Sequence, residues 1–81
     1  MKTIVFTAAA ARQIDDLPDE ARTQILNDLD QYAMMGTGNV KKLTGREGYR
    51  LRSGRYRVLF DEDQTTVLAV YVGKRETTTY R

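Results

Sequence analysis

The sequence predicts a single α+β domain in which a strand and an antiparallel helix pair precede a three-stranded antiparallel meander, with both helices on one face of the sheet. Two observations predict this order, β-α-α-β-β-β. At Val40 the composition changes from acidic and alanine-rich to basic and β-branched, and the hydrophobic spacing changes there from steps of three and four to alternation. A chain of 81 residues supports only one hydrophobic core, so residues 1–81 are predicted to form one domain.

The first half predicts a strand followed by two helices. Residues 2–6 are rich in strand formers, and residues 8–17 favour a helix with Thr7 as its N-cap. Pro18 ends that helix and suits the first position of a second one, which the loop at residues 36–39 stops. Apolar residues recur at helical spacing along both: Ala10, Ile14 and Leu17 in the first, and Ala21, Ile25, Leu29, Tyr32 and Ala33 in the second.

The second half predicts a β-hairpin and a third strand. Residues 49–53 and 56–61 alternate apolar and polar, and Gly54-Arg55 fits a two-residue turn between them. This turn pairs Ser53 with Tyr56, Arg52 with Arg57, Leu51 with Val58 and Tyr49 with Phe60. One face of the hairpin is then apolar and the other cationic. Residues 65–72 are apolar on both faces, as expected for a central strand.

Composition excludes several kinds of chemistry. The chain has no cysteine and no histidine, which excludes disulfides, thiolate catalysis and the commonest metal ligand. The cluster Asp61-Glu62-Asp63 lacks the spacing of a cation-binding loop and is predicted to be a charged turn, so we expect no metal and no cofactor. No apolar run approaches the roughly 20 residues that span a bilayer, and the N-terminus lacks a signal-peptide pattern. The sequence therefore predicts a cytoplasmic protein without membrane contact.

Positive charge is concentrated in the second half. Residues 1–40 carry three basic and six acidic side chains, a net charge of −3, whereas residues 41–81 carry ten basic and five acidic ones, a net charge of +5. Such asymmetry is typical of a surface that meets a polyanion, although a solubilising face is the alternative interpretation.

The predicted pairing of Arg52 with Arg57 favours the functional interpretation. Like charges directly opposite each other on adjacent strands cost a few tenths to about 1 kcal/mol, so the fold gains nothing from this pair. Arg50 is expected on the same face, and Lys74-Arg75 follows the third strand, so five cations are predicted to converge there. Three apolar residues are expected to share this face: Leu59, Leu68 and Val70. The alternative is the solvated face of a half-buried hairpin.

Other large side chains are assigned mainly to packing. The alternation predicts core packing, with base stacking as the alternative, for three tyrosines: Tyr49, Tyr56 and Tyr71. Tyr80 lies in a polar tail without an obvious core to fill, so a functional contact is as well supported there as packing. Met34 and Met35 are expected to pack at the end of the second helix, with a partner surface as the alternative.

Four segments of the second half carry a resemblance to a known family. They are Lys41-Lys42-Leu43-Thr44-Gly45, Gly48-Tyr49-Arg50-Leu51-Arg52, Arg55-Tyr56-Arg57-Val58-Leu59-Phe60, and Val72-Gly73-Lys74-Arg75-Glu76 with Tyr80 after it. In order and spacing they resemble the pattern of the RelE/ParE toxin superfamily, and the preceding helix pair extends the match over nearly the whole chain. Each segment alone is common, whereas four at this spacing are typical of the superfamily.

The resemblance implies a toxin of a type II toxin–antitoxin system, similar to the RelE-like mRNA interferases, which cleave messenger RNA on the ribosome. In that reaction the messenger's 2′-hydroxyl attacks the adjacent phosphate without metal, leaving a 2′,3′-cyclic phosphate and a free 5′-hydroxyl. The resemblance assigns Arg57 to the pentacoordinate phosphate, Arg75 to the departing 5′-oxygen and Tyr80 to a base. It assigns Arg50 and Arg52 to the RNA backbone and the 2′-oxygen region. Further RNA contacts are expected from Lys41, Lys42, Arg46, Arg55, Lys74 and Arg81.

The general base departs from the family pattern. In the best-studied branch the positions that match Arg50 and Arg52 are lysines, one of them a proposed base, whereas arginine is essentially never deprotonated in proteins. Glu47 is one conceivable substitute, and catalysis by positioning and charge stabilisation alone is the other interpretation. Two further functions stay open: a ParE-like toxin that inhibits DNA gyrase without cleaving RNA, and a degenerate toxin that only binds its antitoxin.

The resemblance also implies partners. A cognate antitoxin is expected to cover the arginine face with an amphipathic, partly acidic segment that folds on binding and contacts Leu59, Leu68 and Val70. The ribosome and messenger RNA are the other expected partners.

Overall fold

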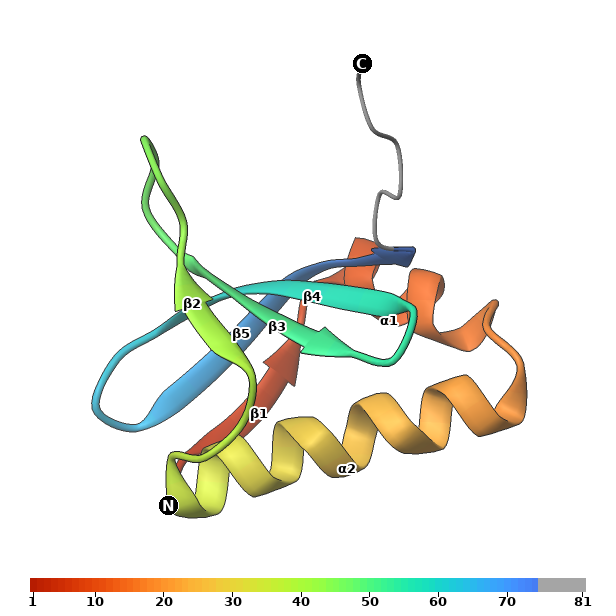
Figure 1. Ribbon diagram of the computed structural model, residues 1–81, viewed down its shortest axis with the longest axis horizontal. Coiled ribbons are helices and arrows are strands. Elements are labelled where there is room, and N and C mark those ends of the chain that lie inside the picture. The colour runs from red at the N-terminus through yellow and green to blue at the C-terminus, as the bar shows by residue number, and fades with distance from the viewer. Residues whose placement is uncertain (75–81) are drawn as a thin grey trace.

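The computed structural model describes residues 1–74, which form two helices and a five-stranded sheet (Figure 1). The elements are, in chain order, β1 (Thr3–Phe6), α1 (Ala8–Asp15), α2 (Asp19–Met35), β2 (Val40–Lys42), β3 (Tyr49–Ser53), β4 (Tyr56–Glu62) and β5 (Thr66–Lys74). The predicted α+β class and element order are confirmed, with β2 as an additional short strand.

Local signals set the helix ends. The Thr7 hydroxyl accepts a hydrogen bond from the Ala10 N–H at 3.1 Å, which confirms the predicted N-cap. Pro18 is the N-cap of α2 rather than its first residue. Gly36 ends α2 in the left-handed conformation, with a φ of 73°, as predicted from the loop that it begins. Within residues 1–74 neither helix combines the length and apolarity that crossing a bilayer requires.

The sheet is mixed, in the order β1-β5-β4-β3-β2. β3, β4 and β5 form the predicted antiparallel meander. β1 runs parallel to β5 at one edge, which makes β5 a central strand, and β2 pairs antiparallel with β3 at the other edge. Gly54 has a φ of 60° at the first position of the hairpin turn, a conformation that glycine adopts readily. The turn fixes the predicted register, including Arg52 opposite Arg57.

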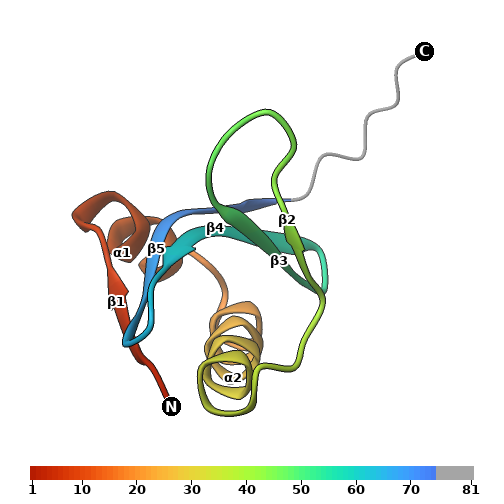
Figure 2. The ribbon, with the colours of Figure 1, turned by 90° about the vertical axis from the view of Figure 1, so that its left-hand side faces the viewer.

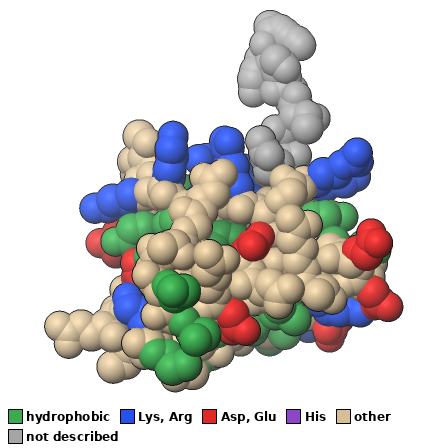
Figure 3. Space-filling view, turned by 60° about the horizontal axis from the view of Figure 1, so that its bottom comes forward, with side chains coloured by type: hydrophobic (Ala, Val, Ile, Leu, Met, Phe, Trp, Pro, Cys, Tyr) green, Lys and Arg blue, Asp and Glu red, His purple; other side chains and the backbone are tan. Residues whose placement is uncertain are grey.

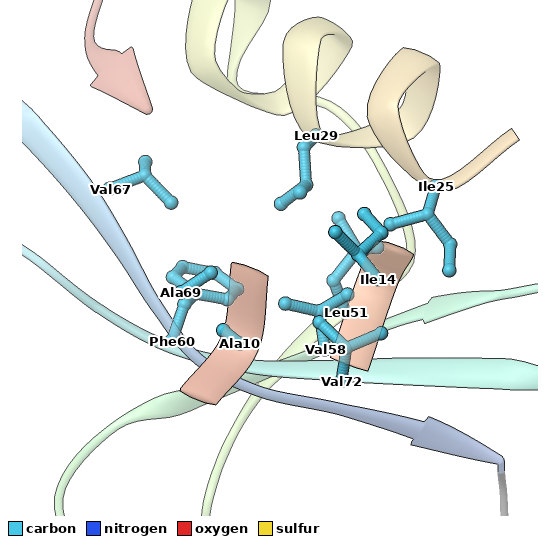
Figure 4. Packing of buried hydrophobic residues seen from close by; sticks show 10 residues of the cluster. All are labelled: Ala10, Ile14, Ile25, Leu29, Leu51, Val58, Phe60, Val67, Ala69 and Val72. Carbon is cyan, nitrogen blue, oxygen red and sulfur yellow. The ribbon is translucent and has the colours of Figure 1, made fainter. Parts of the chain in front are cut away.

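Both helices pack on one face of the sheet and form a single core with it. Figure 4 shows α1 and α2 side chains meeting those of the strands. The core residues are Ala10, Ile14, Ile25, Leu29, Leu51, Val58, Phe60, Val67, Ala69 and Val72. Phe60 is 1% exposed and lies with its ring centroid 5.4 Å from that of Tyr32 and 5.5 Å from that of Tyr49. The single buried polar side chain among residues 1–74, Ser53, donates a 2.6 Å hydrogen bond to Asp28 of α2.

A β-bulge interrupts the pairing of β4 with β5. Phe60 pairs with Ala69, but the preceding residue, Leu59, pairs with Tyr71. Val70 is therefore an extra residue on β5, and the alternation of side chains along this strand is shifted by one position beyond it.

The bulge corrects two sequence predictions. Beyond it, Val72 is the residue that faces the helices, with 3% of its surface exposed. Tyr71 and Gly73 consequently lie on the face away from the helices, so the prediction that Tyr71 packs in the core is wrong. Lys74 pairs with Tyr56 and is turned off the arginine face, so its predicted convergence with the arginines is also wrong.

Candidate nucleic-acid interface

Neither helix covers the second face of the sheet in the part of the chain that the structure describes (Figure 2). We call this surface the open face and define it by these residues, which the register places on it: Lys41, Arg50, Arg52, Arg57, Leu59, Asp61, Leu68, Tyr71 and Gly73, with Val5 of β1 beside Leu68. Two cross-strand pairs are cationic, Lys41 with Arg50 and Arg52 with Arg57. The predicted arginine face is thus present, and β2 adds a lysine to it.

Arg57 lies at the centre of the cationic part of the open face. It pairs with Arg52 on β3 and with Gly73 on β5. Its side chain is half-buried, and no acceptor among residues 1–74 forms a hydrogen bond with its buried Nε atom. A guanidinium carries five N–H donors in a planar fork, and a buried donor without an acceptor costs about 1–3 kcal/mol. Arg57 is therefore ready to donate to an anion such as phosphate.

Tyr71 is the site residue that the sequence prediction missed. The Arg57 guanidinium carbon lies over the Tyr71 ring, 6.0 Å from its centroid, at the outer limit of a cation–π contact. The tyrosine hydroxyl lies so close to Gly73 that a Cβ on this glycine would be only 2.3 Å from it. The ring therefore lies across Gly73, beside Arg57. Alternation did not reveal this arrangement because β5 is apolar on both faces.

The other predicted RNA contacts are spread around the open face. Lys41 lies on it, whereas Lys42 pairs with Tyr49, whose side of the sheet faces the helices. Arg46 is exposed in the loop before β3, and Arg55 is exposed in the hairpin turn. Arg75, Tyr80 and Arg81 lie outside the described residues.

Carboxylates occupy the end of the open face that is remote from the hairpin turn. Asp61 pairs with Leu68, which in turn pairs with Val5 of β1. Val5, Asp61, Glu62, Asp63, Thr66 and Leu68 line a hollow of about 290 Å³. Charge on the open face is thus divided between a cationic part near the turn and an acidic part near β1. On the face of the molecule drawn in Figure 3, Lys and Arg side chains lie mainly along the upper rim.

Glu47 lies near this acidic end rather than beside Arg57. Its neighbour Gly48 lies beside Asp61: a Cβ built on Gly48 would be 3.2 Å from Asp61 Oδ1. From Asp61 to Arg57 the chain advances four residues along β4, about 13 Å at 3.3 Å per residue. The structure therefore gives no support to Glu47 as a base for a phosphate bound at Arg57.

Two of the three carboxylates of the predicted charged turn, Glu62 and Asp63, accept structural hydrogen bonds. Asp63 accepts hydrogen bonds from the Thr65 and Thr66 backbone N–H groups, both at 2.9 Å, and these bonds lower its pKa. Glu62 accepts 2.7 Å hydrogen bonds from Lys2 Nζ and the Tyr32 hydroxyl. Within residues 1–74 no three acidic side chains gather in a way that could hold a metal ion.

The Glu62 contacts change the pKa values of both partners in the α2–β4 hydrogen bond. Burial acts to raise the pKa of Glu62, but the hydrogen bonds from Lys2 and Tyr32 outweigh it and the pKa is lowered. Burial and the hydrogen bond to Glu62 raise the pKa of Tyr32 to about 12. The hydrogen bonds of Glu62 with Lys2 and Tyr32 join β4 to the N-terminal segment and to α2.

Two groups of apolar residues bear on the sequence predictions. On or beside the open face, Leu59 and Leu68 are half-buried, and Val70, at the bulge, is 36% exposed. At the end of α2, Met34 is 58% and Met35 is 71% exposed, so the prediction that these methionines pack at the helix end is wrong. Both point into solvent because Ala33 occupies the buried position of that turn.

Neither a protein-family model nor a curated protein sequence matches this chain. Solved structures do match. The RelBE2 toxin–antitoxin complex from Mycobacterium tuberculosis is similar with a TM-score of 0.74 and 28% identity, covering 91% of this chain and 98% of that one. The RelE–RelB complex from Pyrococcus horikoshii OT3 has a TM-score of 0.80 and 19% identity, covering 95% and 98% of the two chains. The isolated RelE toxin of E. coli has a TM-score of 0.80 and 21% identity, covering 96% and 88%.

These matches confirm the predicted resemblance to RelE-like toxins. The similarity extends over nearly the full length of each matched chain, so it includes the helix pair and the sheet together. The two matches with lower identity establish the shared fold.

Proposed function

We propose that this chain, which has the fold of the RelE-like toxin superfamily, is the toxin of a type II toxin–antitoxin pair and cleaves messenger RNA on the ribosome. The observation that carries the proposal is the cationic pair of the open face near the hairpin turn, which neither helix covers. Arg52 and Arg57 lie directly opposite each other, and the buried Nε of Arg57 forms no hydrogen bond with any residue of the 1–74 segment. A folded chain gains no stability from this arrangement, whereas a phosphate would satisfy both features.

In the proposed reaction, the 2′-hydroxyl of the RNA attacks the adjacent phosphate. A P–O bond forms to the 2′-oxygen and the bond to the 5′-oxygen breaks, giving a 2′,3′-cyclic phosphate, while the proton is transferred to the departing 5′-oxygen. Arg57 stabilises the extra charge on the pentacoordinate phosphate, as preorganised donors do where charge develops. Arg50 and Arg52 hold the RNA backbone, and Arg75 and Tyr80 complete the site in our proposal.

Catalysis in this proposal depends on positioning and charge stabilisation rather than on a strong general base. The cationic residues of the open face are arginines and one lysine, Lys41, at the sheet edge. Arginine stays protonated at every accessible pH, so it orients and stabilises but does not accept a proton. We therefore expect a slower reaction than one assisted by a well-placed base.

We also propose that an antitoxin covers the open face. Two of the matched structures are toxin–antitoxin complexes, from M. tuberculosis and P. horikoshii. The cationic part suits an acidic segment, and the neighbouring Leu59, Leu68 and Val70 suit its apolar side chains. Such a segment would block the RNA site directly.

The test is primer extension on a reporter messenger in a reconstituted translation system. The intact protein is expected to produce breaks that depend on translation, and Arg57→Ala is expected to reduce their rate by roughly 100- to 1,000-fold. Arg12→Ala is the matched control because Arg12 is an exposed arginine on α1, away from the open face, and it should cleave at the rate of the unaltered protein. Absence of breaks, with growth arrest and DNA damage in cells, would move the assignment to gyrase inhibition.

A further inference from the structure

We infer that the Tyr71 ring is a stacking platform for a nucleobase of the single-stranded RNA whose phosphate is bound by Arg57. This inference rests on the proposed function and names a substrate contact within the same site. It makes Tyr71 a specificity-determining residue of the open face, separate from the cationic residues that hold the backbone.

The bulge in β5 is what presents Tyr71 to the open face. If β5 were regular, with Val70 taking its place in the alternation, Tyr71 would share the face of Val67 and Ala69 and point toward the helices, where Val58 and Phe60 lie in the core. Bulges redirect side chains and are frequent beside functional sites. Here the result is an aromatic ring on the face that both helices leave uncovered.

Gly73 provides the space in which the ring lies. Every atom that an added Cβ at this position would approach most closely belongs to Tyr71, at 2.3, 2.7 and 2.9 Å. The backbone of Gly73 does not have a positive φ, so its conformation does not itself require glycine. The small residue is therefore explained by the ring above it, which rests across the strand instead of standing away from the sheet.

The ring and the phosphate-binding arginine are arranged as single-stranded RNA requires. Proteins bind such strands by combining cations along the backbone with aromatic rings on which bases stack. The Arg57 guanidinium carbon is 6.0 Å from the Tyr71 centroid, and Arg57 is directly opposite Gly73 across the two strands. A phosphate and a base of one short RNA segment can occupy these adjacent positions together.

Three variants separate the ring from the rest of Tyr71. Tyr71→Phe keeps the ring and removes the hydroxyl, and Tyr71→Leu removes the ring while keeping an apolar side chain. Gly73→Ala keeps Tyr71 but forces the ring from its place, because the new methyl group would overlap the tyrosine. Each is assayed in the translation system for cleavage rate against messenger concentration and for the identity of the bases beside each break. Thermal unfolding of each variant is recorded in parallel.

The inference predicts that Tyr71→Phe keeps the preference for bases next to the break, because the ring remains in place over Gly73. Tyr71→Leu and Gly73→Ala should both weaken apparent binding of the messenger by roughly 5- to 100-fold, the usual effect of losing one base stack. They should also lose discrimination among bases at one position next to the break. A structural role would not move this base preference.

Two results would overturn the inference while leaving the proposed function intact. One is unaltered cleavage and base preference in Tyr71→Leu. The other is an equal loss in Tyr71→Phe and Tyr71→Leu at all sites, with lowered thermal stability, which would assign the ring to folding. If the unaltered protein makes no breaks at all, the proposed function fails and the inference fails with it.

Discussion

The two faces of this sheet are made by neighbouring residues of the same strands, yet one is packed and hydrogen-bonded and the other carries opposed cations. On the helix-covered face, Phe60 is packed between two aromatic rings, and the buried Ser53 is hydrogen-bonded to Asp28. On the open face, Arg52 opposes Arg57, whose buried Nε has no hydrogen-bond acceptor within residues 1–74. The contacts on the helix-covered face stabilise the fold, so folding explains why these residues are there. The like-charge pair and the unpaired donor on the open face destabilise the fold, so we explain these residues by binding.

This contrast predicts that substitutions on the helix-covered face change stability far more than substitutions on the open face. Phe60→Ala should lower the free energy of unfolding by about 3–5 kcal/mol, because it removes a fully buried ring and leaves a cavity. Leu59→Ala is the matched variant, since Leu59 precedes Phe60 on β4 but faces the other side and is half-buried. We expect it to cost about 1 kcal/mol. Equal losses in urea denaturation would break the comparison.

Ionisation should also affect the helix-covered face. Folding raises the pKa of Tyr32 from its ordinary value of 10.0 to about 12, because the phenol is partly desolvated and donates to Glu62. The stability from this group is complete below pH 10 and is lost as the pH rises toward 12, when the half-buried phenolate would face the Glu62 carboxylate. Over this pH range we expect the free energy of unfolding to fall less in Tyr32→Phe than in the unaltered protein, by about 1–2 kcal/mol.

The measurement is the free energy of unfolding between pH 9 and pH 12, taken for the unaltered protein and two variants. Tyr56→Phe is the control because Tyr56 takes no part in the Lys2–Glu62–Tyr32 contacts. An alkaline slope in Tyr32→Phe as steep as in the unaltered protein would show that the hydrogen bond to Glu62 does not protect the phenol.

The helix-covered face was predictable from sequence because its signals are local. Thr7 and Gly36 determine helix ends by capping, and the two-residue turn at Gly54 sets the register that places Arg52 opposite Arg57. Each of these depends on a few adjacent residues. The hairpin alternates clearly between apolar and polar positions, so a one-residue slip would have buried an arginine.

The parts that were not predicted depend on contacts between distant segments. β2 has three residues and too little pattern to indicate a strand, and the parallel pairing of β1 with β5 joins the two ends of the described chain. The bulge at Val70 lies in a strand that is apolar on both faces, where alternation carries no information. The sequence prediction therefore placed Tyr71 on the helix-covered side, although base stacking was its alternative.

The smallest expected effect gives the sharpest test, because stability and activity should change in opposite directions. Arg52→Glu places a carboxylate opposite Arg57 and converts a like-charge pair into an attractive one, which should raise the free energy of unfolding by a few tenths to about 1 kcal/mol. The same change should abolish cleavage, since it places a negative charge where phosphate binds.

Arg52→Gln is the control: it removes the repulsion without supplying a negative charge, so its gain in stability should be smaller. Because Arg52 is exposed, the stabilisation in Arg52→Glu should shrink in 1 M salt, where exposed charges more than about 3 Å apart are largely screened. If Arg52→Glu were less stable than the unaltered protein, the arginines would contribute to folding. Stability would then explain the residues of both faces.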